Sequence, residues 1–270
     1  MTASTFPIYY VNAFTDQLFK GNPAAIILLD EWLDDTLLIS LAAEINLSET
    51  AFIVDRHIRW FTPKIEVDLC GHATLAAAFI IDKLSSTSQQ PIIFQSKSGE
   101  LIVTRTTDGF TLDFPQIACS IAPSELKDHL SKIIHTQIDE LYLANDRYIC
   151  FLSHEQDVAS CSPDFDAIAQ LPLPGLCITA LSQNNTCDFV SRYFAPAKGV
   201  NEDPVTGTAH CAIAPLWAKR LNKNQLTGHQ ISVRGGFVDC KIINSRVHLS
   251  GRATLFLTGT IQLENYLDKK

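Results

Sequence analysis

Four side chains that can move a proton stand close to glycine-led segments of this sequence. Glu49 follows residues 47–48 (LS) at the entry to an apolar segment, where desolvation raises a carboxyl pKa toward that of a general acid or base. His72 follows a glycine and is suited to donating a hydrogen bond or shuttling a proton. Asp203 precedes a proline and can take a proton or bind a substrate. Cys70 lies at a predicted helix N-terminus, a position that lowers the pKa of a thiol.

Each of these residues also has a purely structural interpretation. Glu49 fits a capping or surface glutamate, and Asp203 fits a helix-capping aspartate. His72 fits a packed, hydrogen-bonded histidine, and Cys70 fits an inert buried cysteine. Local sequence alone leaves both interpretations open for all four residues.

Two predicted helices, at about residues 71–83 and 207–220, place glycines near these groups. Gly71 and Gly207 would begin the helices, where unpaired backbone N–H groups and the helix dipole attract an anion and a missing side chain lets it approach. Thr208 adds a hydroxyl at the second start. If the two starts converge on one cleft, they would hold a carboxylate substrate. The alternative is two ordinary helix starts whose glycines serve packing.

Weak internal similarity supports the idea that the two starts are related. Three pairs of short segments occur in the same order in both halves of the chain. The two members of each pair are separated by nearly the same number of residues, close to half the chain length, as expected for a duplicated unit. The pairs are RWFTP at 59–63 with RYFAP at 192–196, GHATLAAA at 71–78 with GTAHCAIA at 207–214, and LS at 47–48 with LS at 181–182. The sequence therefore predicts two domains, 1–116 (possibly completed by 259–270) and 117–258, with a ligand cleft between them.

Strand-like and helix-like segments alternate along the chain, which predicts an α+β fold with a strand-rich layer around one buried helix in each half. An aspartate at 34 or 35 is expected to cap a helix with its apolar face at Leu37, Leu41 and Ile45. A further helix is expected near 164–170. Strands are expected at 7–13, 24–29, 50–54, 58–61, 229–233, 236–243, 246–250 and 254–261, and several more between 91 and 114, with turns at 97–99 and 107–109.

The composition is that of an ordinary globular protein: 46% hydrophobic and 19% charged residues, with a formal net charge of −8. No basic run suggests nucleic acid as a partner, and no segment resembles a signal peptide or a membrane span, so a soluble, cytoplasmic protein is expected. The eight cysteines form no CxxC pair and are expected to be reduced and mainly buried. Neither a metal nor a cofactor is expected.

Four separated motifs resemble the phenazine biosynthesis protein family, PhzF-like. They are GNPAA at 21–25, LSET at 47–50, the FTP to CGHAT segment at 61–74, and EDPVTGTA at 202–209, within a likeness from about residue 8 to 258. The resemblance implies a diaminopimelate-epimerase-like fold: two pseudo-symmetric domains, each a curved, mostly antiparallel sheet around a central buried helix, with a cofactor-free site between them. It also implies a homodimer.

The resemblance further implies roles for individual residues. In the type member, a glutamate at the LSET position moves a proton during isomerisation of a dihydro-hydroxyanthranilate, and that role falls on Glu49. Supporting polar roles fall on His72, Asp203 and Thr208. Cys70 matches the first thiol of two-cysteine racemases of this fold, but Thr206 occupies the second position, and a threonine hydroxyl is too weak a base at neutral pH.

We therefore expect a cofactor-independent isomerase of a small anionic metabolite. Glu49, His72 and Asp203 would be catalytic, and Cys70, Gly71, Gly207 and Thr208 would bind the substrate. Two alternatives stay open: an epimerase or racemase that uses Cys70, and a protein that binds a small ligand without catalysis.

Overall fold

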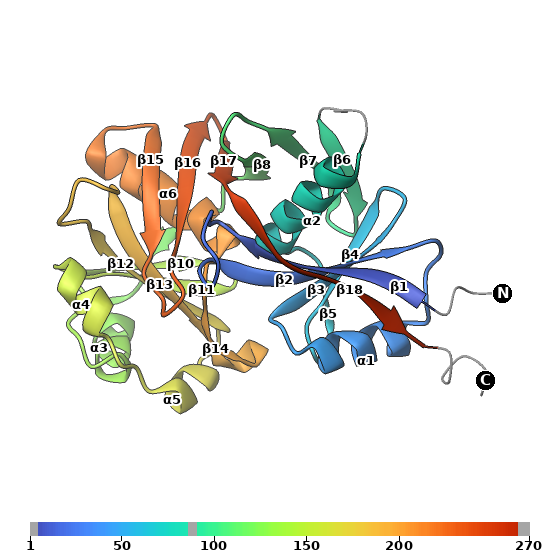
Figure 1. The fold of residues 1–270 in the computed structure, drawn as a ribbon. Helices are drawn as coiled ribbons and strands as arrows, with labels where there is room; N and C mark the ends of the chain where they lie inside the picture. The colour runs from blue at the N-terminus through green and yellow to red at the C-terminus, as the bar shows by residue number, and fades with distance from the viewer. Residues whose placement is uncertain (1–4, 86–90, 264–270) are drawn as a thin grey trace. The chain divides into compact units, whose positions relative to one another are not determined.

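The computed structural model describes residues 5–85 and 91–263, and the chain forms two compact units (Figure 1). Unit 1 comprises Met1–Leu112 with Gly251–Lys270, and unit 2 comprises Asp113–Ser250. These boundaries lie at 112/113 and 250/251, whereas the sequence was divided at 116/117 and 258/259. Residues 264–270 of the expected returning segment lie outside the described residues.

Unit 1 is built on a mixed sheet in which most neighbouring strands pair antiparallel and a few pair parallel. The strands β18, β1 and β2 pair antiparallel in that order, and β2 then pairs parallel with β3. From there β3 pairs antiparallel with β4, which pairs antiparallel with β5 and parallel with β6, followed by the antiparallel pairs β6–β7 and β7–β8. Their bounds are β1 Thr5–Ala13, β2 Asn22–Leu29, β3 Glu49–Val54, β4 His57–Phe61, β5 Glu66–Val67, β6 Ile92–Ser96, β7 Gly99–Arg105, β8 Phe110–Pro115 and β18 Ala253–Gln262.

Unit 2 repeats this pairing strand for strand. The pair β10–β11 is antiparallel and β11–β12 is parallel, as in β1–β2 and β2–β3. The strand β13 pairs antiparallel with β12 and β14 and parallel with β15, as β4 does with its three neighbours, and β15–β16–β17 are antiparallel. Their bounds are β9 Ser120–Ile121, β10 Glu140–Ala144, β11 Arg147–Phe151, β12 Gly175–Leu181, β13 Phe189–Ala195, β14 Val200–Asp203, β15 Gln225–Gln230, β16 Gly236–Ile243 and β17 Arg246–Gly251.

A buried helix follows the fifth strand of each pattern. In unit 1, α2 (Gly71–Leu84) packs against β1, β2, β3 and β18, and its residues are buried through most of its length. In unit 2, α6 (Gly207–Leu221) packs against β15 and β16. The predicted helices at 71–83 and 207–220 are therefore confirmed to within a residue, and the α+β class with them.

A proline inside α6 is accommodated by a substitute hydrogen bond. Pro215 has no N–H to donate to the carbonyl of Cys211 four residues earlier. The backbone N–H of Ile117 donates to that carbonyl instead, at 3.1 Å. The Cys211 carbonyl is therefore satisfied although Pro215 cannot bond to it, and α6 continues to Leu221.

An equivalent ion pair occurs in both units, where it joins the two strands that precede each buried helix. Arg59 on β4 donates to Glu66 through Nε at 2.7 Å and Nη2 at 2.8 Å. Arg192 on β13 donates to Glu202 in the same way, at 2.7 and 2.9 Å. Each guanidinium carbon also lies 5.0 Å from the ring centroid of the phenylalanine two residues further on. The RWFTP and RYFAP segments are thus equivalent in structure as well as in sequence.

The third sequence match was wrong. Residues 47–48 form the turn that leads into β3, whereas Leu181 ends β12, the strand that takes the place of β3 in unit 2. The strand expected at 229–233 was also misplaced, because β15 spans Gln225–Gln230 and the chain leaves it where the N–H of Ile231 donates to Ser191.

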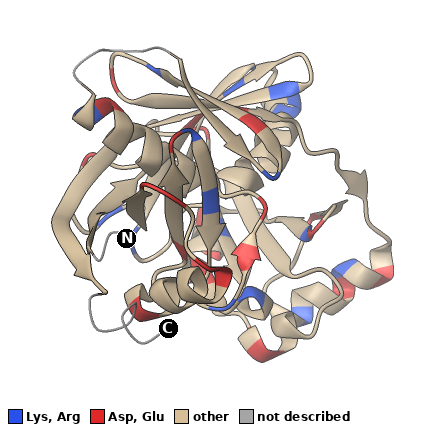
Figure 2. Ribbon diagram, turned by 90° about the vertical axis from the view of Figure 1, so that its right-hand side faces the viewer, with Lys and Arg blue, Asp and Glu red and all other residues tan. Residues whose placement is uncertain are grey.

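Shorter helices cover the sheets. The helix α1 (Asp35–Ile45) is capped by Asp34, whose side chain accepts from the N–H of Thr36 at 3.0 Å, as predicted. Unit 2 carries α5 (Phe165–Ala169) near the predicted 164–170, together with two helices that the sequence analysis missed, α3 (Ser124–Ile133) and α4 (Glu155–Ser160). Among the described residues, no helix has the length and apolarity to cross a membrane. Basic and acidic residues are interspersed along the ribbon (Figure 2).

Candidate functional site

Three of the predicted site residues meet in unit 1. Glu49 is the first residue of β3, Cys70 is the N-cap of α2, and His72 is the second residue of that helix. One ligand atom of each lies within 4.8 Å of the others. The distance between Glu49 Oε2 and His72 Nε2 is 3.6 Å, and that between Cys70 Sγ and His72 Nδ1 is 3.5 Å. His72 thus lies between the carboxylate and the thiol.

The imidazole of His72 is neutral at physiological pH. Burial lowers its pKa to about 3, although a hydrogen bond with the backbone of Pro23 favours the charged form. Its Nε2 is buried and has no hydrogen-bond partner among the described residues. The close approach of Glu49 is therefore not an ion pair, and the carboxylate is not neutralised by this neighbour.

The start of β2 fixes the histidine ring. Asn22, the first residue of β2, is fully buried and places its amide nitrogen 3.1 Å from His72 Nδ1. The N-cap carbonyl of Cys70 accepts a hydrogen bond from Thr74 Oγ1 at 2.6 Å, whereas the Cys70 side chain makes no capping bond. The first turn of α2 is thus held by side chains that leave its leading N–H groups uncapped.

The second helix start carries the remaining predicted residues. Asp203 ends β14, three residues before the N-cap of α6, and accepts a hydrogen bond from Thr206 Oγ1 at 2.5 Å. Thr206, the N-cap, takes the position of Cys70, and its backbone N–H donates to the buried Gln230 side chain at 2.8 Å. His210 Nδ1 lies 2.8 Å from the Thr206 carbonyl, just as Thr74 reaches that of Cys70.

Gly207 and Thr208 lie in the first turn of α6, and neither backbone N–H donates to a described residue. Thr208 Oγ1 accepts a hydrogen bond from Arg147 Nη1 at 3.2 Å. Arg147 is the first residue of β11, as Asn22 is of β2, and each contacts the second residue of the following buried helix. Unit 2 therefore has a cation where unit 1 has an amide.

The unit 1 cluster offers a carboxylate oxygen, a thiol and an imidazole, a donor set that zinc accepts in proteins. No metal was expected from the sequence. Asn22 and Arg147 were not expected as site residues either. Asn22 lies within the quoted GNPAA motif, so a signal existed, whereas Arg147 follows a turn of residues 145–146 that replaces the longer segment 14–21 and hides the equivalence.

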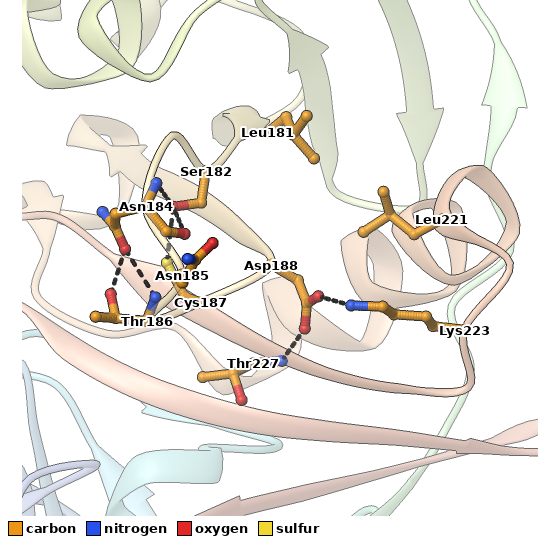
Figure 3. Close-up of a pocket in the computed structure, with 10 residues that line it drawn as sticks. All are labelled: Leu181, Ser182, Asn184, Asn185, Thr186, Cys187, Asp188, Leu221, Lys223 and Thr227. Carbon is orange, nitrogen blue, oxygen red and sulfur yellow. Dashed lines mark hydrogen bonds and ion pairs between the residues drawn. The ribbon is translucent and has the colours of Figure 1, made fainter.

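A pocket of about 460 Å³ lies elsewhere in unit 2, and none of the predicted site residues line it (Figure 3). Its polar groups largely bind one another: Asp188 pairs with Lys223 at 2.5 Å and accepts from the N–H of Thr227 at 2.9 Å, and Ser182 accepts from the N–H of Asn184 at 3.3 Å. Because these polar groups already bind one another, we do not assign the catalytic site to this pocket.

Comparison with known proteins agrees with the motifs. The model of the phenazine biosynthesis-like protein family matches residues 11–259. An uncharacterised isomerase of Pseudomonas aeruginosa is 46% identical over 262 residues, 95% of this chain and 98% of that protein. A crystal structure of a PhzF-family protein from Enterococcus faecalis is 42% identical with a TM-score of 0.90, covering 96% of this chain and 100% of the other.

A predicted epimerase of Pseudomonas aeruginosa shares the fold at 16% identity, with a TM-score of 0.75 over 95% of this chain and 99% of the other. The family match spans nearly the whole chain, and the strongly similar relative is named as an isomerase. The chain belongs to the phenazine biosynthesis-like protein family and is an isomerase.

Proposed function

We propose that the protein is a cofactor-independent isomerase that moves a proton within a small carboxylate-bearing metabolite, with Glu49 as the single acid and base. The observation that carries the proposal is the environment of Glu49. Its side chain is 22% exposed, and its neighbour His72 is buried and neutral. A partly exposed carboxylate beside a buried, neutral imidazole is suited to general acid–base chemistry.

A carboxylate can perform both halves of such a reaction. It removes a proton from one carbon, and the resulting carboxylic acid returns it to another carbon of the same molecule, so that the enzyme ends as it began. No net oxidation occurs. In this proposal His72 Nε2, which has no hydrogen-bond partner among the described residues, forms a hydrogen bond with the substrate, and Asp203, with its hydroxyl neighbour Thr206, shapes the path of the proton.

The helix starts bind the substrate in this proposal. Cys70 and Gly71 on α2, and Gly207 and Thr208 on α6, provide uncapped first turns in which backbone N–H groups and the helix dipole favour an anion. Ligand soaking followed by crystallography should place the carboxylate of a bound compound at such a first turn, against the backbone N–H groups of Gly207 or of Gly71.

An epimerase remains the second candidate because of one contact. Cys70 Sγ lies 3.5 Å from His72 Nδ1, and an imidazole at that distance can accept the thiol proton. A two-base racemase needs a second group on the other face of its substrate. The equivalent N-cap is Thr206, whose hydroxyl donates to Asp203, so a second thiol is missing from that position.

Hydrogen exchange with solvent tests the proposal. The wild-type protein and the Glu49→Gln variant are incubated in D₂O with a panel of small carboxylates, and deuterium in the recovered compounds is measured by mass spectrometry. At least one compound should gain deuterium with the wild type, and the variant should be slower by roughly 10²–10⁴-fold. Saturable binding without deuterium would favour the non-catalytic alternative, and loss of exchange in Cys70→Ser but not in Glu49→Gln would favour the epimerase.

A homodimer is also proposed. Several large apolar side chains of unit 1 are exposed, and Phe256 on β18 contacts both Tyr10 and Phe19 with ring centroids 6.0 Å apart. Exposed apolar clusters of this kind mark interaction surfaces. Sedimentation equilibrium should give twice the 29.9 kDa chain mass, and a monomer at micromolar concentration would contradict the proposal.

A further inference from the structure

Arg147 is the most deeply buried charged side chain beside a predicted binding residue. It is 4% exposed and lies at the start of β11. Its Nε donates to Asp146 at 2.7 Å and its Nη1 donates to Thr208 Oγ1 at 3.2 Å. No hydrogen bond from Nη2 to a described residue is present. A buried guanidinium therefore keeps donors available beside the first turn of α6.

The charge around Arg147 is only partly balanced. Asp146 also pairs with Lys198 at 3.0 Å, so one carboxylate serves two cations. Burial alone would raise the pKa of Asp146, but hydrogen bonding and charge from Arg147 and Lys198 lower it to about 2. Asp203, a further carboxylate of unit 2, accepts a hydrogen bond from Thr206.

Two thiols and a phenol that interact with the guanidinium are neutral at physiological pH. Burial raises the pKa of Cys177 and of Cys211 to about 12, and it raises that of Tyr193 as well, although Arg147 opposes all three shifts. The Tyr193 ring lies under the guanidinium, 5.2 Å from its carbon. Gly175 makes this arrangement possible, because a Cβ there would lie 2.1 Å from the Tyr193 hydroxyl and 3.2 Å from Arg147 Cβ.

We propose that Arg147 is a substrate-binding residue that, with Thr208 and the first turn of α6, holds the carboxylate group of the substrate. This inference rests on the proposed function, since it names the group that binds the acid end of that metabolite. A guanidinium offers a carboxylate two parallel N–H donors, which a lysine cannot reproduce. The equivalent Asn22 of unit 1 is uncharged, so the start of α6 carries a cation that the equivalent position at α2 lacks, and the acid group is assigned to α6.

Binding of acetate tests the assignment without knowledge of the substrate. The ¹⁵N-labelled full-length protein is titrated with sodium acetate at ionic strength held constant with sodium chloride. The amide signals of Gly207 and Thr208 should shift saturably in the wild type. Arg147→Met should weaken acetate binding by roughly 10- to 100-fold, and Arg147→Lys should retain only part of the affinity.

Arg246→Met is the matched control, because Arg246 is another arginine of unit 2 that pairs with an aspartate, Asp113, but is about half exposed. Acetate affinity should be unchanged in this variant. If circular dichroism shows that Arg147→Met does not fold, Arg147→Lys and Thr208→Val decide, and both should bind acetate more weakly. Saturable shifts that are absent in the wild type, or equal in the wild type and the Arg147 variants, would overturn the assignment.

The outcome is separable from that of the proposed function. Glu49→Gln should lose deuterium exchange but bind acetate with wild-type affinity. Glu49-dependent exchange without Arg147-dependent acetate binding would refute only the role of Arg147. Arg147-dependent acetate binding without any Glu49-dependent exchange would refute only the proton chemistry.

Discussion

Acidification should destabilise the protein through His72, and the size of the effect follows from its burial. Its pKa is about 3 in the folded protein against 6.5 for an ordinary histidine. Between these values the unfolded chain binds a proton that the folded protein does not. Stability conferred by the neutral imidazole is therefore fully present above pH 6.5 and is lost progressively as the pH falls toward 3.

At pH 5 this single histidine should lower the free energy of unfolding by about 2 kcal/mol relative to pH 8. The buried His210, whose pKa burial lowers to about 4, should contribute a similar amount. Urea unfolding followed by circular dichroism at both pH values measures the total. His72→Asn should remove about half of the combined histidine effect, because an amide does not titrate.

His129→Asn is the control, since His129 is exposed, and its pH dependence should match that of the wild type. The comparison uses the difference between pH 8 and pH 5 for each variant, so a uniform loss of stability in His72→Asn does not affect it. If His72→Asn retained the full wild-type pH dependence, the pKa of His72 would be the same in the folded protein as in the unfolded chain. Burial would then not keep the imidazole neutral below pH 6.5, and its contact with Glu49 would be an ion pair at pH 5.

Further predictions concern the thiol, the packing around β15 and the ion pair near α2. Cys70→Ser should reduce turnover far less than Glu49→Gln in steady-state assays, and a greater loss in Cys70→Ser would contradict the single-carboxylate mechanism. Gly228→Ala should destabilise the protein by about 1–3 kcal/mol in urea unfolding, because the added Cβ would lie 2.6 Å from Phe189 Cζ; unchanged stability would refute this packing. Glu66→Gln, which leaves Arg59 without a charged partner on β5, should lower the melting temperature more than the exposed Glu100→Gln does.

The fold could be predicted where sequence and local physics agree. The glycine-led, alanine-rich segments at 71–78 and 207–214 begin the two buried helices because small residues permit close packing on the sheets. Their shared offset also predicted the repeat. The amphipathic helix α3 was missed, although Leu126, Leu130 and Ile133 share a helical spacing. The helix α4 has six residues, too few for a periodic signal, and depends on a cap from Asp157 to the N–H of His154.

Strand β15 shows how tertiary packing can override a local signal. Gly228 suggests a turn in the sequence, yet it lies within the strand, because the Phe189 ring and His210 fill the space where its side chain would be. Arg147 shows the limit for the site. Its position corresponds to that of Asn22, and this correspondence becomes visible only when the β10–β11 pair is seen to repeat the β1–β2 pair.

The central claim is that one carboxylate both removes and returns the proton. The direct measurement uses a compound identified by the D₂O screen, deuterated at the carbon that loses its hydrogen and turned over once in H₂O by excess enzyme. The account predicts that part of the deuterium appears at the receiving carbon of the same molecule, because Glu49 carries it there, and that Glu49→Gln abolishes the transfer. The account would be contradicted if Glu49→Gln formed product at the wild-type rate and that product carried no deuterium at the receiving carbon.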